Sequence, residues 1–260
     1  MSIAEKLTTI AENTPKVYEA GLGQGEENIK TQFWKDILRW DGVSESGQPT
    51  NLNNAFSGVY WTKDTFKPPC RIVPNSEPSS ARGMFAYFNL GETKRDNMVS
   101  ITYDMLDLSN CKTNTSVYGM FENATFESIE VDLSGVPQLY NTFSCNNGGK
   151  IYKIRTKINA TTFSNCFNNA SMLEELILEE GSGIGGNGFN VQWSTKLNKA
   201  SFISIYNALS PNTTGLSITV SKTAINNAFG INVDNETTYP VGSEYYNLRH
   251  SKDNWTINYI

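Results

Sequence analysis

The chain has 260 residues, of which 18% are charged, and a formal net charge of -5. This acidic balance, without any cluster of Lys or Arg, argues against nucleic acid as a partner. No apolar run approaches the roughly 20 residues that span a bilayer, so we expect no membrane insertion. The low charged fraction and the many Asn, Thr, Ser, Gly and aromatic residues favour a β-rich protein over a helical bundle.

Residues 1–43 are predicted to form a helical segment at the N-terminus. Ile3, Leu7, Ile10 and Val17 occupy heptad a/d positions. Because so short a helix is marginal in water, it must pack on something. It either docks the chain or oligomerises it, for example as a homotrimer, or it folds back as a cap on the first repeat. The first residues lack the basic region and apolar core of a Sec signal, so we expect a chain that stays or is assembled in the cytoplasm.

A phenylalanine recurs through the middle of the chain, within residues 44–196. Phe121, Phe143, Phe167 and Phe189 are separated by steps of 22, 24 and 22 residues, and Phe85 begins the same pattern earlier. Such a period indicates a solenoid, in which each small unit buries its apolar face only by stacking on its neighbours. We expect the phenylalanines to form a spine on the return side of each turn.

A triplet with a fixed internal spacing follows Phe85, Phe121, Phe143 and Phe167, and it is apolar except for Thr156 in the third slot of one of them. Because strand side chains alternate between the two faces, the last two members of each triplet predict a half-buried strand. The first member marks the turn that leads into the strand. The triplets are Met98/Ile101/Tyr103, Phe126/Ile129/Val131, Ile151/Ile154/Thr156 and Leu173/Leu176/Leu178.

The outward positions of these strands carry charge. If the strands stack in register, an acidic row lies beside a basic row, with a further acid beyond it. These positions are Thr102/Asp104, Glu130/Asp132, Arg155/Lys157 and Ile177/Glu179. Opposite charges on adjacent strands stabilise pairing by about 0.2 to 1 kcal/mol each, so the simpler interpretation is self-complementary sheet chemistry. The functional interpretation is a charged recognition surface.

Four features that suggest chemistry have simpler explanations. Cys145 and Cys166 lie about one repeat apart, which favours equivalent buried thiols over a disulfide, and the cysteine spacing fits no zinc site. Gly181 to Gly186 matches GxGxxG, but no helix is expected after it to hold a phosphate, so a glycine-rich turn stacked between repeats is the better explanation. The lone histidine, His250, is expected to be an exposed side chain. The carboxylate pair Glu130 and Asp132 fits a solvated sheet face better than a glycosidase site. We therefore expect no catalytic residues, metal or cofactor.

Residues 197–260 depart from the repeat and are predicted to form a small α/β cap. Helical spacing spans Lys199 to Leu209, and alternation over Leu216 to Val220 predicts a strand. Ser221 to Phe229 is typical of another short helix, and the segment from Trp255 predicts a closing strand.

A series of segments along the chain has an order that is typical of one family. These segments are the leader Met1 to Gly21, Phe33-Trp34, Asn54 to Gly58, Trp61-Thr62, Thr65 to Pro68, Leu197 to Ser201, Ser221 to Phe229 and Trp255-Thr-Ile. Through them the chain resembles BspA-type leucine-rich-repeat proteins, in the version encoded by phages and prophages of gut Firmicutes. The resemblance covers nearly the whole chain, although Asp41 to Glu45 replaces the usual Gln-x-Asn-Gly-x-Arg stretch. It implies an α/β repeat fold: a leucine-rich-repeat-like solenoid with short parallel strands, an N-terminal helix and a small C-terminal cap.

The same resemblance implies a non-enzymatic phage tail, baseplate or fibre component, present in the virion. Its N-terminus would contact other tail or baseplate proteins, and its solenoid surface would recognise a bacterial surface glycan or protein. The alternative is a bacterial leucine-rich-repeat surface adhesin or general interaction module, which needs an export route.

Overall fold

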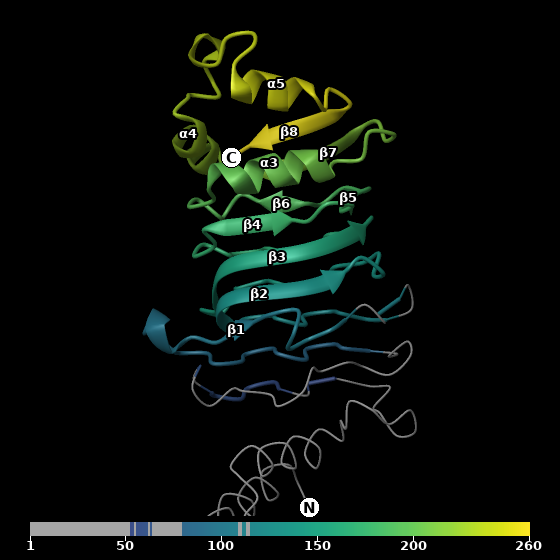
Figure 1. Ribbon diagram of the computed structural model, residues 1–260, viewed down its shortest axis with the longest axis vertical. Helices are drawn as coiled ribbons and strands as arrows, with labels where there is room; N and C mark the ends of the chain where they lie inside the picture. Colours follow the sequence, from purple (N-terminus) through teal and green to yellow (C-terminus); the bar gives the residue numbers. More distant parts are fainter. Residues whose placement is uncertain (1–52, 55, 62, 64–79, 109–110, 113–114) are drawn as a thin grey trace, which may run out of the picture.

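A computed structural model describes residues 53–54, 56–61, 63, 80–108, 111–112 and 115–260. In this part of the chain, parallel strands stack as a β-solenoid of about five turns with few helices (Figure 1). The predicted helix with Ile3, Leu7, Ile10 and Val17 lies outside the described residues. The elements are the 3-10 helices η1 (Arg95–Asn97) and η2 (Glu236–Thr238), the strands β1 (Ser100–Ile101), β2 (Thr125–Leu133), β3 (Lys150–Ala160), β4 (Glu175–Leu178), β5 (Gly183–Ile184), β6 (Asn190–Val191), β7 (Leu216–Val220) and β8 (Trp255–Tyr259), and the helices α3 (Lys199–Ala208), α4 (Lys222–Phe229) and α5 (Glu244–His250).

The apolar triplets form one wall of the solenoid, as the sequence predicts. Strands β1, β2, β3 and β4 pair in parallel in that order, and Ile129 faces Ile101 on one side and Ile154 on the other. β2 and β3 also include the first triplet members, Phe126 and Ile151, which pair with each other. In both strands two residues separate this first member from the second one, so the inward and outward side chains do not alternate regularly there. Because the irregularity is shared, the register between the two strands is kept.

The recurring phenylalanines form the predicted spine on the opposite wall. Phe56, Phe85, Phe121, Phe143 and Phe167 stack nearly parallel, with ring centroids 4.8, 5.4, 5.4 and 5.6 Å apart. All five are buried. We call this column the phenylalanine ladder. Stacked aromatic pairs of this kind contribute about 0.5 to 1.5 kcal/mol each beyond the area that they bury.

Backbone hydrogen bonds join the turns along this return wall in one direction. In each of the first four ladder turns, the N–H of the phenylalanine donates to a carbonyl of the next turn, as from Phe121 to Thr142 at 2.8 Å. The N–H groups two residues before and two after it do the same, and we call these three donors the N–H row. The residue two before the phenylalanine has a positive φ in every ladder turn, and Gly or Asn occupies it, as at Gly119 and Asn141. These residue types tolerate that conformation best.

The residues from 197 onward cover the C-terminal end of the stack (Figure 1). Asn198 caps the N-terminus of α3, Ser221 caps α4 and Ser243 caps α5, each accepting a hydrogen bond from a backbone N–H in the first turn. The helix predicted at Lys199, the strand predicted at Leu216–Val220 and the closing strand are confirmed.

Three further expectations are not confirmed in full. The solenoid is confirmed, whereas its assignment to the leucine-rich-repeat class stays a prediction. Tyr103 is not the inward third member of a strand, because β1 ends at Ile101. Its hydroxyl instead points outward over β3, 3.5 Å from the Arg155 carbonyl. Thr102 and Asp104 follow β1 in a turn and therefore do not continue the charged rows in register.

Candidate binding face

The outward side chains of β2, β3 and β4 form the surface that we call the outer strand face. Arg155 lies at its centre, opposite Glu130 in the register of β2 and β3. Its guanidinium is 4.0 Å from the Glu130 carboxylate and 3.8 Å from that of Glu179. Its side chain is 47% exposed, so these are solvent-screened pairs that each contribute about 1 kcal/mol or less. The acid, base and acid order that the sequence predicts is present on this face.

The next outward position of each strand is also in register, because Asp132 of β2 pairs with Lys157 of β3. Asp132 accepts a hydrogen bond of 2.8 Å from the Ser134 backbone N–H. The stem of Lys157 runs beside Gly181, where an added Cβ would lie 3.2 Å from the lysine Cε. The Glu130 carboxylate therefore lies near the Arg155 guanidinium, and the Asp132 carboxylate is bonded to the Ser134 N–H. These contacts favour a solvated sheet face over a glycosidase pair.

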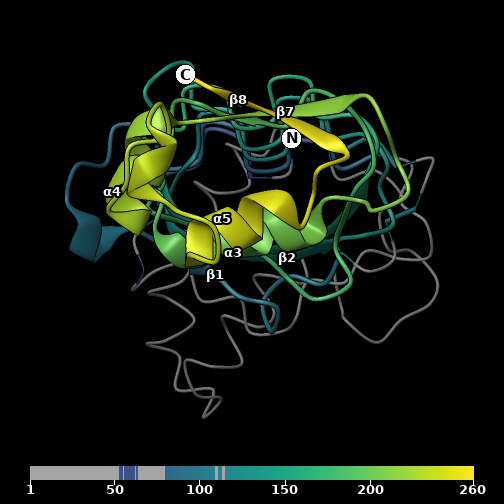
Figure 2. The same ribbon diagram turned by 90° about the horizontal axis from the view of Figure 1, so that it is seen from above.

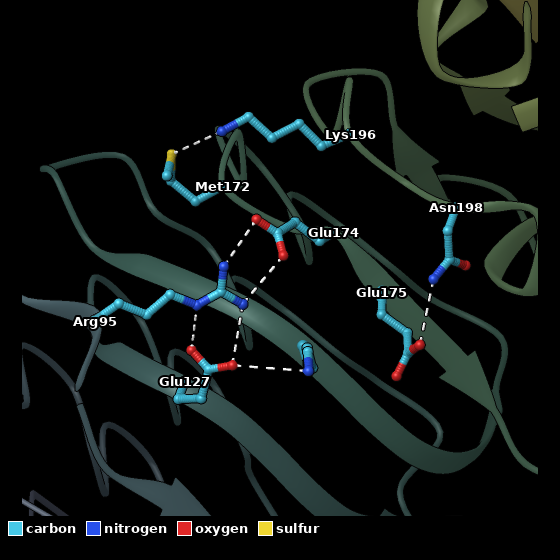
Figure 3. Close-up of polar contacts among 8 residues, drawn as sticks. Arg95, Glu127, Met172, Glu174, Glu175, Lys196 and Asn198 are labelled. Atoms are coloured by element: carbon cyan, nitrogen blue, oxygen red, sulfur yellow. Dashed lines mark hydrogen bonds and ion pairs between the residues drawn. The ribbon is translucent and has the colours of Figure 1, made fainter. Parts of the chain in front are cut away.

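A second charged cluster lies at the start of the same strands (Figure 3). Arg95, from η1, donates to both carboxylate oxygens of Glu127 at 2.5 and 3.0 Å and to both of Glu174 at 3.1 Å. Its guanidinium also stacks on the Tyr152 ring, 4.1 Å from the centroid. Lys153 approaches Glu127 at 3.8 Å. The hydrogen bonds that Arg95 donates to the Glu127 and Glu174 carboxylates hold its pKa above the usual range.

The sequence pattern did not single out this Arg95 cluster. Glu127, Lys153 and Glu174 fill the spacers between the first and second apolar residues of their triplets, so their outward direction was available from the same pattern. Arg95 comes from a segment between turns. Only in the folded chain does it contact both Glu127 and Glu174, and Glu174 lies 79 residues further along the chain.

The outer strand face thus carries opposite charges side by side, and Arg95, Lys153 and Arg155 are paired with carboxylates there. A ligand that bound here through its own charge would have to break pairs that already exist, whereas a polar ligand could hydrogen-bond to the exposed edges of these groups.

The remaining sequence candidates have structural roles. Gly186, the last glycine of the GxGxxG match, lies against the preceding turn, where an added Cβ would be 1.8 Å from the Thr161 carbonyl oxygen. The turn-stacking explanation of that motif is therefore supported. His250 ends α5, half-exposed, with Nδ1 3.0 Å from Asp253. Cys145 and Cys166 are free, buried thiols, and burial raises the pKa of Cys145 to about 12.

Comparisons with protein-family models, with curated proteins and with solved structures each find no match to this chain. Within the described residues, no group of three or more His, Cys, Asp or Glu side chains is placed to hold a metal ion. None of the helices in this part of the chain is long and apolar enough to cross a membrane.

Proposed function

We propose that this chain is a non-enzymatic phage or phage-tail-like structural protein of the leucine-rich-repeat class that presents its solenoid for host recognition. The observation that supports the proposal most directly is the outer strand face. It is polar, and its two arginines, Arg95 and Arg155, are each paired with two carboxylates. Solenoids commonly bind partners through an extended surface of this kind. The resemblance of the leader and closing segments supplies the tail-region context.

In this proposal, residues 1–43 attach the protein to other tail or baseplate proteins and the outer strand face meets a bacterial surface glycan or protein. The attachment part is tested by light scattering on the full chain and on a chain that lacks residues 1–43. We expect the full chain to form a larger assembly of subunits. An equal number of subunits in both would overturn the oligomerisation role of Ile3, Leu7, Ile10 and Val17.

Host recognition is tested with fluorescently labelled full-length protein on a panel of cultured Firmicutes strains. We expect saturable binding to some strains and its loss in Arg155→Glu, which places a third carboxylate between Glu130 and Glu179. The matched control is Lys222→Glu, which changes the charge by the same amount beside another carboxylate, Asp234, on α4 and not on the strand wall. Equal binding by wild type and Arg155→Glu would remove the outer strand face from the proposal.

Virion membership is tested by mass spectrometry of purified particles from an induced culture that carries the gene. The tail proposal expects peptides of this chain in the particles. Their absence there, combined with intact protein on the surface of uninduced cells, would favour the bacterial adhesin instead.

A further inference from the structure

A further backbone hydrogen bond precedes the N–H row at two interfaces between ladder turns. Its donor is the N–H four residues before one ladder phenylalanine, and its acceptor is the carbonyl five residues before the next. Ala81 donates in this way to Ser116 at 2.8 Å, and Leu139 donates to Thr162 at 2.9 Å. These bonds join neighbouring turns at the point where each turn enters the return wall.

The corresponding bond is missing at the interface between these two, where the turn of Phe121 meets the next one. The equivalent donor there is the N–H of Val117, and the equivalent acceptor is the carbonyl of Gln138. Neither group has a hydrogen-bond partner among the described residues, and the Gln138 N–H has none there either. Two residues further on, Gly119 donates to Tyr140 at 2.9 Å, so the regular bonding resumes. The gap therefore leaves two backbone donors and one acceptor unpaired at a single place.

A cavity of about 120 Å³ opens at this gap. Val117 and Gln138 both line it, together with Tyr118, Val136 and Tyr140 among others. Residues 136–140 follow the end of β2 and lead into the return wall. Seen from above the stack, β2 lies on the opposite side from β7 (Figure 2). The cavity is thus at the corner between the strand wall and the return wall, apart from the outer strand face.

The lining of the cavity matches an amide group. An amide carries one acceptor, its carbonyl oxygen, and at least one N–H donor, as the missing backbone bond requires on its two sides. None of the lining residues is charged, so a charged ligand would lose its hydration without gaining a counter-charge. Val117 and Val136 are buried and supply an apolar part of the wall.

The volume distinguishes between kinds of amide. One water takes up about 30 Å³ in the liquid, so a cavity of about 120 Å³ has room for about four heavy atoms. An acetamido group is of this size, since it consists of a nitrogen, a carbonyl carbon, an oxygen and a methyl carbon. The amide of a peptide continues into a chain on both sides, whereas the acetamido group ends in a methyl that can pack on Val117 and Val136.

Two tyrosine rings border the cavity and offer a surface for the rest of the ligand. Tyr118 is 38% exposed, and its ring is held by the Arg82 guanidinium, 4.6 Å from the centroid, and by a 3.1 Å hydrogen bond from the Asn141 amide to its hydroxyl. Tyr140 is half-buried. A tyrosine combines an apolar ring with a polar hydroxyl, which suits a sugar ring with its apolar faces and polar edge.

We propose that this cavity binds an N-acetylated amino sugar of a glycan, with the acetamido group in the gap between the two turns. The acetamido carbonyl accepts from the Val117 N–H, and the acetamido N–H donates to the Gln138 carbonyl. The sugar ring packs on Tyr140. This site goes beyond the proposed function, and its test uses free sugar and purified protein. Failure here would leave the virion and cell-binding tests unaffected.

The test is a titration of the full-length protein with N-acetylglucosamine, followed by backbone amide NMR. We expect saturable shifts of the Val117 and Gln138 amide protons. Glucose lacks the acetamido group and N-acetylglycinamide lacks the sugar ring, so both are expected to bind at least tenfold more weakly. The proposal is overturned if these two amides do not shift, or if glucose or N-acetylglycinamide binds as tightly as N-acetylglucosamine.

The role of the aromatic ring is tested at Tyr140. Tyr140→Ala is expected to weaken N-acetylglucosamine binding by about fivefold or more, whereas Tyr140→Phe keeps the ring and is expected to stay within about twofold of wild type. The matched control is Tyr87→Ala, the same substitution at a tyrosine that is 40% exposed and does not line the cavity. It is expected to bind as wild type does. Equal affinities of Tyr140→Ala and Tyr87→Ala would also overturn the proposal.

Discussion

Each ladder turn of the return wall buries one phenylalanine, and inside the stack its ring packs against rings from the turns on both sides. Phe143 is fully buried, with centroids of Phe121 and Phe167 at 5.4 and 5.6 Å. The residue two positions before it, Asn141, has a φ of 50° and so adopts the left-handed conformation that directs the chain into this turn. The buried Phe143 ring and the left-handed conformation of Asn141 together therefore define the geometry of this turn of the stack.

Phe143→Ala is expected to lower the free energy of unfolding by about 3 to 5 kcal/mol, since it removes both ring contacts and leaves a cavity. Phe143→Leu keeps most of the volume and is expected to cost clearly less. Val241→Ala, at a side chain that is 81% exposed, is the control and should change stability by no more than about 0.5 kcal/mol. Denaturant unfolding measures all three. A loss below about 1 kcal/mol for Phe143→Ala would show that the ladder does not carry the stack.

The buried thiols predict a dependence on alkaline pH. Burial raises the pKa values of Cys111 and Cys145 to about 12, against about 8.5 for an unfolded thiol. Between about pH 8.5 and 12 the unfolded chain releases protons that the folded chain retains, so the free energy of unfolding falls as pH rises. Urea titrations at about pH 8 and about pH 10.5 measure this slope, which is expected to be shallower in Cys145→Ala. An unchanged slope in that variant would contradict the burial of this thiol.

Among the elements, helix α3 closes the exposed edge of the strand wall. Ser201 Oγ accepts from the Leu176 N–H at 2.9 Å, and Ser204 Oγ accepts from the Leu178 N–H at 3.2 Å. Ser204 also donates to the Leu176 carbonyl at 3.0 Å. A free strand edge is a template for pairing with another chain, so these two hydroxyls and the helix that carries them block edge-to-edge association.

Ser201→Ala is expected to lower the free energy of unfolding by about 1 to 3 kcal/mol, since it leaves the N–H of the buried Leu176 without an acceptor. The control is Ser171→Ala, the same substitution at an exposed serine, which should change stability by no more than about 0.5 kcal/mol. Thermal or denaturant unfolding compares the two variants. Equal small losses would show that the Ser201 hydroxyl does not satisfy the strand edge.

The stack as a whole has one interior and two ends that must be covered. The C-terminal cap buries Phe202, Ile205 and Tyr206 of α3 in the same hydrophobic core as the triplets. Because a solenoid turn contacts only its neighbours, the cap shields the last turn and adds the stability of one further interface.

A chain that ends at residue 196 is therefore expected to be less stable and to aggregate, since β4 loses the cover of α3. Size-exclusion chromatography with light scattering measures the assembly, and denaturant unfolding measures the stability. The full-length chain at the same concentration is the control. A monodisperse truncated chain with unchanged unfolding midpoint would show that residues 197–260 are not a cap.

The repeat, its inward residues and the outward charges of β2 and β3 can all be predicted from the sequence. Phenylalanine spacing and apolar triplets are local, periodic signals, and a stacked architecture repeats the same local physics in each turn. The acid, base and acid order at Glu130, Arg155 and Glu179 follows from the same period.

The features that break the period emerge only when the chain is folded. Arg95 reaches Glu174 across turns, Tyr103 points outward because β1 stops early, and the N–H row loses its acceptors at Asn165 where the next turn becomes a strand. Each of these depends on which segments meet in space, and no spacing along the chain encodes that. The regular stack ends for this reason: one of its turns meets a neighbour with a different backbone conformation.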